Sequence, residues 1–328
     1  MRKNSSMGTH VYFLLCTNNL FYSIITKRKN RRKNMKYLID AFRGFCMALA
    51  DSVPGVSGGT VAFILGFYDK FINSLNNLIS GNKEERIDAI KFLAKLLSGW
   101  VVGMILAVLL LSNVFESHIY AVSSLFLGFI IFAIPVIIKE EKESIKGKYV
   151  FIIFTIIGIA IVAAITYFNP VSGEGASVDI SSLNIGLCIY VFISAMIAIS
   201  AMVLPGISGS TLLLIFGLYI PVINAIKELL HLNLSYLPVL IIFGLGLITG
   251  ILLIIKLIKK ALEKYRPQTI YLIIGLMLGS LSAIVMGPTT LDIPKAPMSV
   301  STFSIIFFII GGAIIFGLEK LKSIIEKK

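Results

Sequence analysis

Two short segments of this sequence combine residue types that can present backbone N–H groups and hydroxyls at one point of the chain. Residues 54–60 read PGVSGGT and residues 205–211 read PGISGST. Proline ends an incoming helix because its ring removes a hydrogen bond and clashes with the preceding turn, while glycine permits a sharp turn. The serine and threonine can cap the next helix or donate to a ligand. Because a helix start attracts negative charge, both segments predict anion binding.

The two segments would form one pocket if they met inside a membrane. Irregular backbone at membrane depth is tolerated only where it is buried in protein or lines a wet cavity. The alternative is a pair of Pro/Gly kinks whose backbone is satisfied by neighbouring helices. The candidate binding residues are Arg43, Asp51, Ser52, Gly55, Ser57, Gly58, Gly59, Thr60, Gly206, Ser208, Gly209, Ser210 and Thr211.

Only the first segment is preceded by ionisable groups. Arg43 and Asp51 are eight residues apart, so on a helix they lean to the same side. Arg43 could bind a phosphate with its forked guanidinium, and Asp51 could pair with Arg43 or carry a proton. Charge inside a membrane is costly and points to function. The structural alternative for Arg43 is snorkelling to the cytoplasmic interface.

The composition fixes the class of protein that must position these residues. Of 328 residues, 57% are hydrophobic and 14% are charged, and mean hydropathy is +0.91. A soluble enzyme could not bury so much apolar surface, and an intrinsically disordered chain would not carry it. Long unbroken apolar runs, in place of short alternating ones, predict an all-α polytopic membrane protein.

Six apolar runs approach the roughly 20 residues that cross a bilayer. Two further regions, 37–80 and 186–230, are apolar but broken by Pro and Gly, and each could be two spans or a re-entrant hairpin. Lys and Arg gather in alternate loops, which places both termini in the cytoplasm. The predicted spans are 96–112, 119–138, 149–168, 237–255, 269–287 and 302–318, with basic loops around 83–95, 139–148, 256–266 and 320–328 and external loops at 113–118, 169–185 and 288–301.

The net charge, the cysteines and the histidines indicate no further binding site. Net charge is +13, but residues 1–34 hold eight basic residues and no acid. We expect these residues to be a poorly ordered extension near anionic lipid. The charge excess therefore does not indicate a nucleic-acid partner. The three cysteines and three histidines show no metal-ligand spacing, so we expect neither a metal nor a cofactor.

The two broken regions are copies of each other. Pro54, Ser57 and Thr60 recur 151 residues later, and downstream glycines at 99, 103 and 128 recur at 246, 250 and 275. Each copy is a broken hairpin followed by three spans, and because three is odd the second copy must be inverted. We therefore predict repeats over 35–172 and 173–328, an arrangement typical of secondary transporters with a substrate site at the repeat interface.

The segments ADSVPGVSGGT at 50–60 and LPGISGS at 204–210, in a repeat of this length, resemble the bacterial polyprenyl-phosphate transporter family. The resemblance covers about residues 35–326. It implies a multi-pass protein of the bacterial cytoplasmic membrane. It also implies that the chain returns undecaprenyl phosphate, the lipid carrier of cell-wall synthesis, from the outer to the inner leaflet. The isoprenoid tail would stay in lipid while rocking of one repeat against the other exposed the phosphate pocket to each leaflet in turn.

Two other functions remain open at this stage. A polyprenyl diphosphate phosphatase would need acid/base groups, but the glutamates fall in loops or at span ends. An ion-coupled transporter of a small soluble anion would carry a water-soluble solute without lipid. The sequence fixes neither the coupling ion, which could be a proton, nor the oligomeric state.

Overall fold

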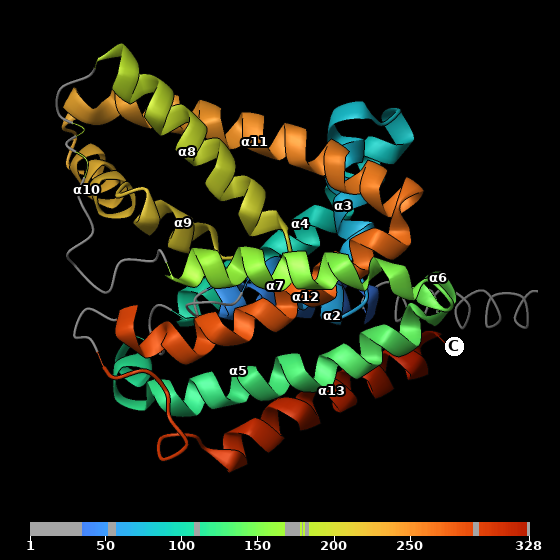
Figure 1. Cartoon of the computed structure of the whole chain (residues 1–328). Helices are drawn as coiled ribbons and strands as arrows, with labels where there is room; N and C mark the ends of the chain where they lie inside the picture. The colour runs from blue at the N-terminus through green and yellow to red at the C-terminus, as the bar shows by residue number, and fades with distance from the viewer. Residues whose placement is uncertain are drawn as a thin grey trace, which may run out of the picture.

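The structure is a computed structural model that describes residues 35–51, 57–107, 112–167, 178, 180, 184–290 and 295–326. Within these ranges the chain forms helices and no strands, which confirms the prediction of an all-α membrane protein. The helices pack side by side in two adjoining groups (Figure 1). The predicted extension, residues 1–34, lies outside the described residues.

The described elements follow the order predicted from the two broken regions. A helix over residues 35–51 comes first. The other elements are α2 (Gly58–Ile64), α3 (Tyr68–Ser80), α4 (Lys83–Leu106), α5 (Ser112–Glu140), α6 (Lys142–Ile145), η2 (Tyr149–Phe151), α7 (Ile152–Tyr167), α8 (Ile185–Val203), α9 (Gly209–Ile215), α10 (Tyr219–Leu230), η3 (Leu234–Tyr236), α11 (Leu237–Lys264), α12 (Arg266–Met286), η4 (Gly287–Thr290) and α13 (Ile305–Glu326).

Six of the described helical stretches are long and apolar enough to cross a membrane. Four contain or closely match predicted spans, Lys83–Leu106 overlaps the predicted span 96–112, and Ile185–Val203 is the first helix of the second broken region. The predicted final span, 302–318, corresponds to a shorter apolar stretch in α13, Ile305–Gly317. Multi-pass insertion therefore follows from the structure as well as from the composition.

Several predicted loops are helical in the structure, because α11 continues to Lys264 and α13 to Glu326. Residues 83–95 form the first half of α4, because Asn82 and Glu85 build a capping box that starts the helix before the apolar run. The predicted external loop 113–118 lies in α5, which kinks at His118, where the backbone leaves helical angles. Apolar runs mark the membrane-crossing part of a helix, and capping residues decide where the helix begins.

The turns that follow the two short helices have the same local geometry. The helix over 35–51 is followed by the seven-residue α2, and α8 is followed by the seven-residue α9. Each short helix ends at a glycine with positive φ, Gly66 at 66° and Gly217 at 63°. Only glycine adopts this left-handed backbone without a steric cost, so the sequence copies specify equal turns.

Glycines set the closest helix crossings, as the sequence indicated. A Cβ atom at Gly99 in α4 would overlap the carbonyl oxygen of Ala41, and one at Gly246 in α11 would overlap that of Phe192 in α8. The matching positions of the two copies thus hold matching helix pairs together. Small residues permit such backbone contact between membrane helices.

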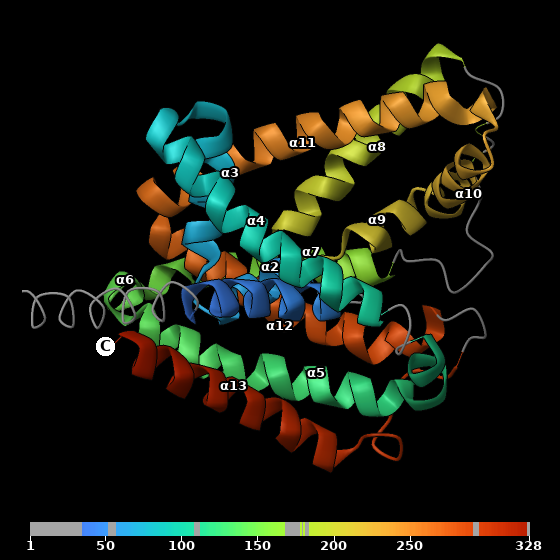
Figure 2. The same cartoon turned by 180° about the vertical axis from the view of Figure 1, so that it is seen from behind.

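The later helices exchange partners between the predicted repeats. The last helix of the second copy, α13, packs on α5 of the first, and α12 of the second packs on α7 of the first. Figures 1 and 2 show α5 and α13 alongside each other on one side of the molecule, with α8 and α11 on the other. The repeat boundaries and their inverted orientation stay predictions.

An ion-pair network joins the two copies at one end of the bundle. Arg266, at the start of α12, donates from Nε and a terminal nitrogen to both carboxylate oxygens of Glu141, and from its other terminal nitrogen to Asp69 in α3 at 2.9 Å. A bidentate arginine pair fixes geometry more firmly than a single exposed contact. The network therefore ties α12 to α3 and to the α5–α6 junction.

Replacing Arg266 with Gln should lower the free energy of unfolding by about 1–2 kcal/mol, since two carboxylates lose a partner that is only partly exposed. Thermal unfolding in detergent would show this as a midpoint lower by a few degrees. The control is Lys259→Gln, which breaks a single, longer pair of 3.9 Å to the exposed Glu263 within α11 and should change the midpoint little. Equal midpoints for the two variants would contradict a joining role for Arg266.

Candidate functional site

The first motif begins α2, and its Ser57 and Thr60 side chains are already hydrogen-bonded within the protein. Ser57 Oγ accepts a hydrogen bond from the Thr60 N–H at 3.3 Å and donates to the Leu204 carbonyl at 3.3 Å. The Ser57 and Thr60 hydroxyls also share a hydrogen bond at 3.0 Å, and both side chains are buried. Ser57 is thus the N-cap of α2 and also reaches the second motif.

Asp51 supplies the negative charge at this helix start. Its carboxylate accepts from the Gly58 N–H at 2.6 Å and from Trp100 Nε1 at 3.0 Å. The place where the sequence predicted a bound anion is therefore held by a carboxylate of the chain itself. The pairing of Asp51 with Arg43, one of the two options raised by their spacing, is not formed, because Arg43 binds Asp40 instead.

The two motifs meet directly, although 151 residues separate them. The Gly206 N–H donates to Thr60 Oγ1 at 2.7 Å, and Tyr68 donates to the Val203 carbonyl at 3.1 Å. The fit at this contact is close, since a Cβ on Gly59 would lie 2.7 Å from the Val203 oxygen. The first candidate residues thus bind the backbone of the second copy.

The second motif leaves its hydroxyls more available. Ser208 precedes α9 but makes no capping hydrogen bond. Its hydroxyl and that of Ser210 share a hydrogen bond at 2.8 Å on an exposed surface. Hydroxyls that bond only to each other can turn toward an incoming acceptor such as a phosphate oxygen.

A cavity of about 250 Å³, which we call the central cavity, is bordered by both motifs. Its polar residues include candidates from both copies, and its remaining wall is apolar. The lining residues are Asp51, Ser57, Trp100, Met104, Ala198, Ile199, Met202, Ser208, Gly209, Ser210, Leu213 and Leu247.

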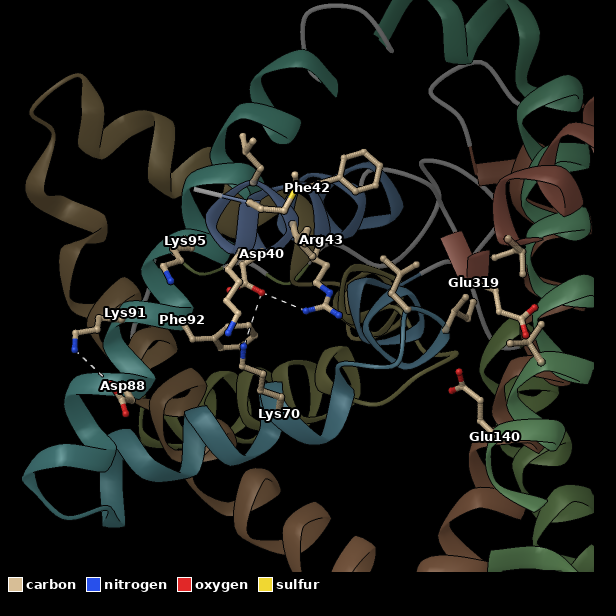
Figure 3. Close-up of a pocket in the computed structure, with 18 residues that line it drawn as sticks. Asp40, Phe42, Arg43, Lys70, Asp88, Lys91, Phe92, Lys95, Glu140 and Glu319 are labelled. Carbon is tan, nitrogen blue, oxygen red and sulfur yellow. Dashed lines mark hydrogen bonds and ion pairs between the residues drawn. The ribbon is translucent and has the colours of Figure 1, made fainter. Parts of the chain in front are cut away.

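The other candidates lie around this cavity or away from it. Gly58, Gly59, Thr60 and Gly206 support the walls through the contacts described above, and Thr211, in α9, is not among the lining residues. Ser52 and Gly55 lie outside the described residues. Arg43 lines a different, larger cavity of about 640 Å³, the basic cavity, with Asp40 and Lys70 (Figure 3).

Trp100 is a cavity residue that the motif analysis did not single out. It could have been found by following the repeat, because Trp100 comes directly after Gly99 and its counterpart after Gly246 is Leu247. Both line the central cavity, as do Asp51 and its counterpart Met202. At these two pairs of positions the first copy contributes a polar side chain to the cavity and the second copy an apolar one.

Within the described part of the chain, no group of three or more His, Cys, Asp or Glu side chains could hold a metal ion. What the arrangement offers is a small, mainly apolar chamber with a few polar groups, between interrupted helices of a polytopic helical bundle. Such a chamber defines the class of membrane transporters.

The chain belongs to the VCA0040-like family, described as undecaprenyl phosphate translocase-like, whose family model matches residues 47–302. It is 37% identical over 258 residues to a polyprenyl-phosphate transporter of Staphylococcus aureus, covering 77% of this chain and 87% of that protein. A polyprenyl-phosphate transporter of Vibrio cholerae is 32% identical over 262 residues, with 77% and 79% covered. No solved structure matches significantly. These relatives are transporters and not enzymes, so the phosphatase alternative is set aside.

Proposed function

We propose that this chain translocates polyprenyl phosphate, with undecaprenyl phosphate as the physiological lipid, from the outer to the inner leaflet of a bacterial cytoplasmic membrane. Family membership and two relatives named for this substrate support the proposal. Both termini would face the cytoplasm, following the loop charges. Membrane lipid and the carried lipid are the partners we propose, and no nucleic acid is required.

The observation that carries the proposal is the shared lining of the central cavity. Ser57 of the first motif and Ser208 and Ser210 of the second face one chamber of about 250 Å³. A phosphate headgroup needs several donors, and a long isoprenoid tail must stay in lipid. We infer that the headgroup binds on the Ser208 side, because Asp51 already occupies the start of α2.

Asp51 gives this site a route to proton coupling. A carboxylate beside a bound phosphate repels it, so protonation of Asp51 would favour headgroup binding. Proton movement and lipid movement would then be linked through one residue. Trp100 and Gly58 hold the carboxylate in place while it changes charge.

A leaflet assay tests these statements. Proteoliposomes that contain polyprenyl phosphate should show protein-dependent transfer between leaflets, with a rate that changes when a pH gradient is imposed. Asp51→Asn, which keeps the shape and removes the charge, should still transfer lipid but lose the response to the gradient. Glu263→Gln, on the exposed end of α11, is the control and should respond like the unaltered protein. No transfer by the unaltered protein would refute the function, and a normal response in Asp51→Asn would refute the coupling.

A further inference from the structure

The basic cavity carries a positive excess at one end of the bundle. Asp40 is buried at 6% exposure and is shared by two cations, Arg43 at 3.2 Å and Lys70 at 3.8 Å. Figure 3 shows the Asp40 carboxylate between them, with both contacts drawn. One carboxylate cannot neutralise two cations, so this cluster retains a net positive charge.

Aromatic rings hold the two cations in position. The Arg43 guanidinium lies 4.9 Å from the centre of the Phe67 ring, and Lys70 Nζ lies 3.8 Å from that of Phe92. Cation–π contacts of this kind orient a charge without neutralising it. The positive groups are therefore fixed before any ligand arrives.

Two more cations add to the cluster. Lys36 and Lys95 line the same cavity, and neither forms an ion pair with any residue that the structure describes. Their charges, with that of Arg43, lie close enough to act on Lys70. The opposite wall carries Glu140 and Glu319, and Lys139 balances Glu319 at 3.2 Å.

The rim of the cavity is apolar where it opens outward. Leu38 and Phe42, one turn apart on the helix over 35–51, line the cavity and are 62% and 49% exposed. A cavity with fixed cations inside and exposed apolar side chains at its edge fits an amphiphile with an anionic head. It fits a small hydrophilic anion less well, because such an anion would gain nothing from the apolar edge.

The fold that the two copies have in common does not require this charged cluster. At the offset of the repeat, the second copy replaces Lys36, Asp40, Arg43 and Lys70 by Leu187, Val191, Ser194 and Pro221. The corresponding helices of the second copy, α8 and α10, form without these charges. The cavity is also lined by Glu140 of α5 and Glu319 of α13, next to the basic segments that the charge pattern places in the cytoplasm.

We propose that the basic cavity is a second binding site, specific to the cytoplasmic side, for the phosphate monoester headgroup of polyprenyl phosphate. This inference rests on the proposed function and adds to it a place where the lipid is held before release into the inner leaflet. The helix over 35–51 joins this site to the central cavity, since Arg43 and Asp51 are about 12 Å apart along its axis. The site would make cytoplasmic binding tighter than outer-face binding.

The test is binding of polyprenyl phosphate to the purified full chain in nanodiscs, with leaflet transfer measured in parallel. Arg43→Gln with Lys70→Gln should weaken binding at least about tenfold, given the loss of two charges close to the headgroup. Lys95→Gln should weaken it by about fivefold, and since Lys95 holds no ion pair among the described residues, this variant keeps the fold intact. Lys259→Gln with Lys260→Gln removes two charges outside both cavities and should bind normally.

Competing ligands show whether the site recognises a polyprenyl phosphate or any phosphate group. The combined outcomes also show which of the two proposals has failed. Inorganic phosphate competing as well as the lipid, or phosphatidylglycerol binding as tightly, would overturn the assignment to a polyprenyl phosphate. If the unaltered protein neither binds nor transfers the lipid, the proposed function fails. If it does both and all the cavity variants bind like it, only the second site is refuted.

Discussion

Replacing Ser57 and Ser208 together with alanine should reduce leaflet transfer of polyprenyl phosphate by at least about a hundredfold. Both hydroxyls line the central cavity, one from each motif. A hydrogen bond from Ser208 to the charged headgroup contributes about 1.5–3 kcal/mol, which alone approaches a factor of this size. Ser57 donates to the Leu204 carbonyl, so its loss also loosens the contact that holds the two motifs together. The measurement is the initial rate of transfer in proteoliposomes at equal protein content.

The two serines need separate controls because their structural roles differ. Ser57 caps α2, and losing a cap costs about 1 kcal/mol of stability, whereas Ser208 makes no capping bond. Ser208→Ala alone should therefore slow transfer without changing thermal stability. Ser200→Ala with Ser282→Ala removes two hydroxyls that bond only carbonyls near the central helices and should transfer normally. Unchanged headgroup binding in the Ser57/Ser208 variant would defeat the assignment of the central cavity.

Gly99→Val should prevent the stable assembly of the first copy. A side chain at this position would overlap the backbone of Ala41, and backbone cannot move aside as a flexible side chain can. Overpacking usually costs 1–3 kcal/mol, and a forced separation of two helices exceeds the upper end of that range. We expect loss of the monodisperse peak in size-exclusion chromatography and a melting midpoint lower by about ten degrees or more.

Gly244→Val is the matched control for this substitution. Gly244 also lies within a long helix, α11, but a Cβ there would meet nothing within 4 Å. This variant should keep the chromatographic profile and midpoint of the unaltered protein. A Gly99→Val protein that is equally stable would show that the crossing of α4 with the helix over 35–51 is not close in the membrane.

The class of protein, four of the spans, the break positions and the meeting of the two motifs could be predicted from the sequence. Each rests on a local signal: long apolar runs, Pro/Gly interruptions, or copied residues such as Ser57 and Ser208. The capping box at Asn82 was equally local and would have given the start of α4. The kink at His118 carries no such signal, because neither proline nor glycine stands at or next to that position.

The division of the charged residues between two cavities could not be predicted. Arg43 and Asp51 share a helix, and spacing alone allowed them to act on one ligand. In the structure they act apart. Asp51 accepts hydrogen bonds from Gly58 and Trp100, whereas Arg43 forms an ion pair with Asp40 and lies over the Phe67 ring. Asp40 lies on the same helix as Arg43, but Gly58, Trp100 and Phe67 come from other parts of the chain, and their approach is a property of the packed bundle.

The exchange of α12 and α13 between the copies determines which parts of the molecule can move as rigid bodies. A motion that separated residues 35–172 from 173–328 would have to pull α5 from α13 and α7 from α12, whose backbones touch at Gly128 and Gly275. Keeping those contacts leaves α5, α7, α12 and α13 as one scaffold. In the transport cycle that we propose, the boundary between moving parts would then cut across both copies.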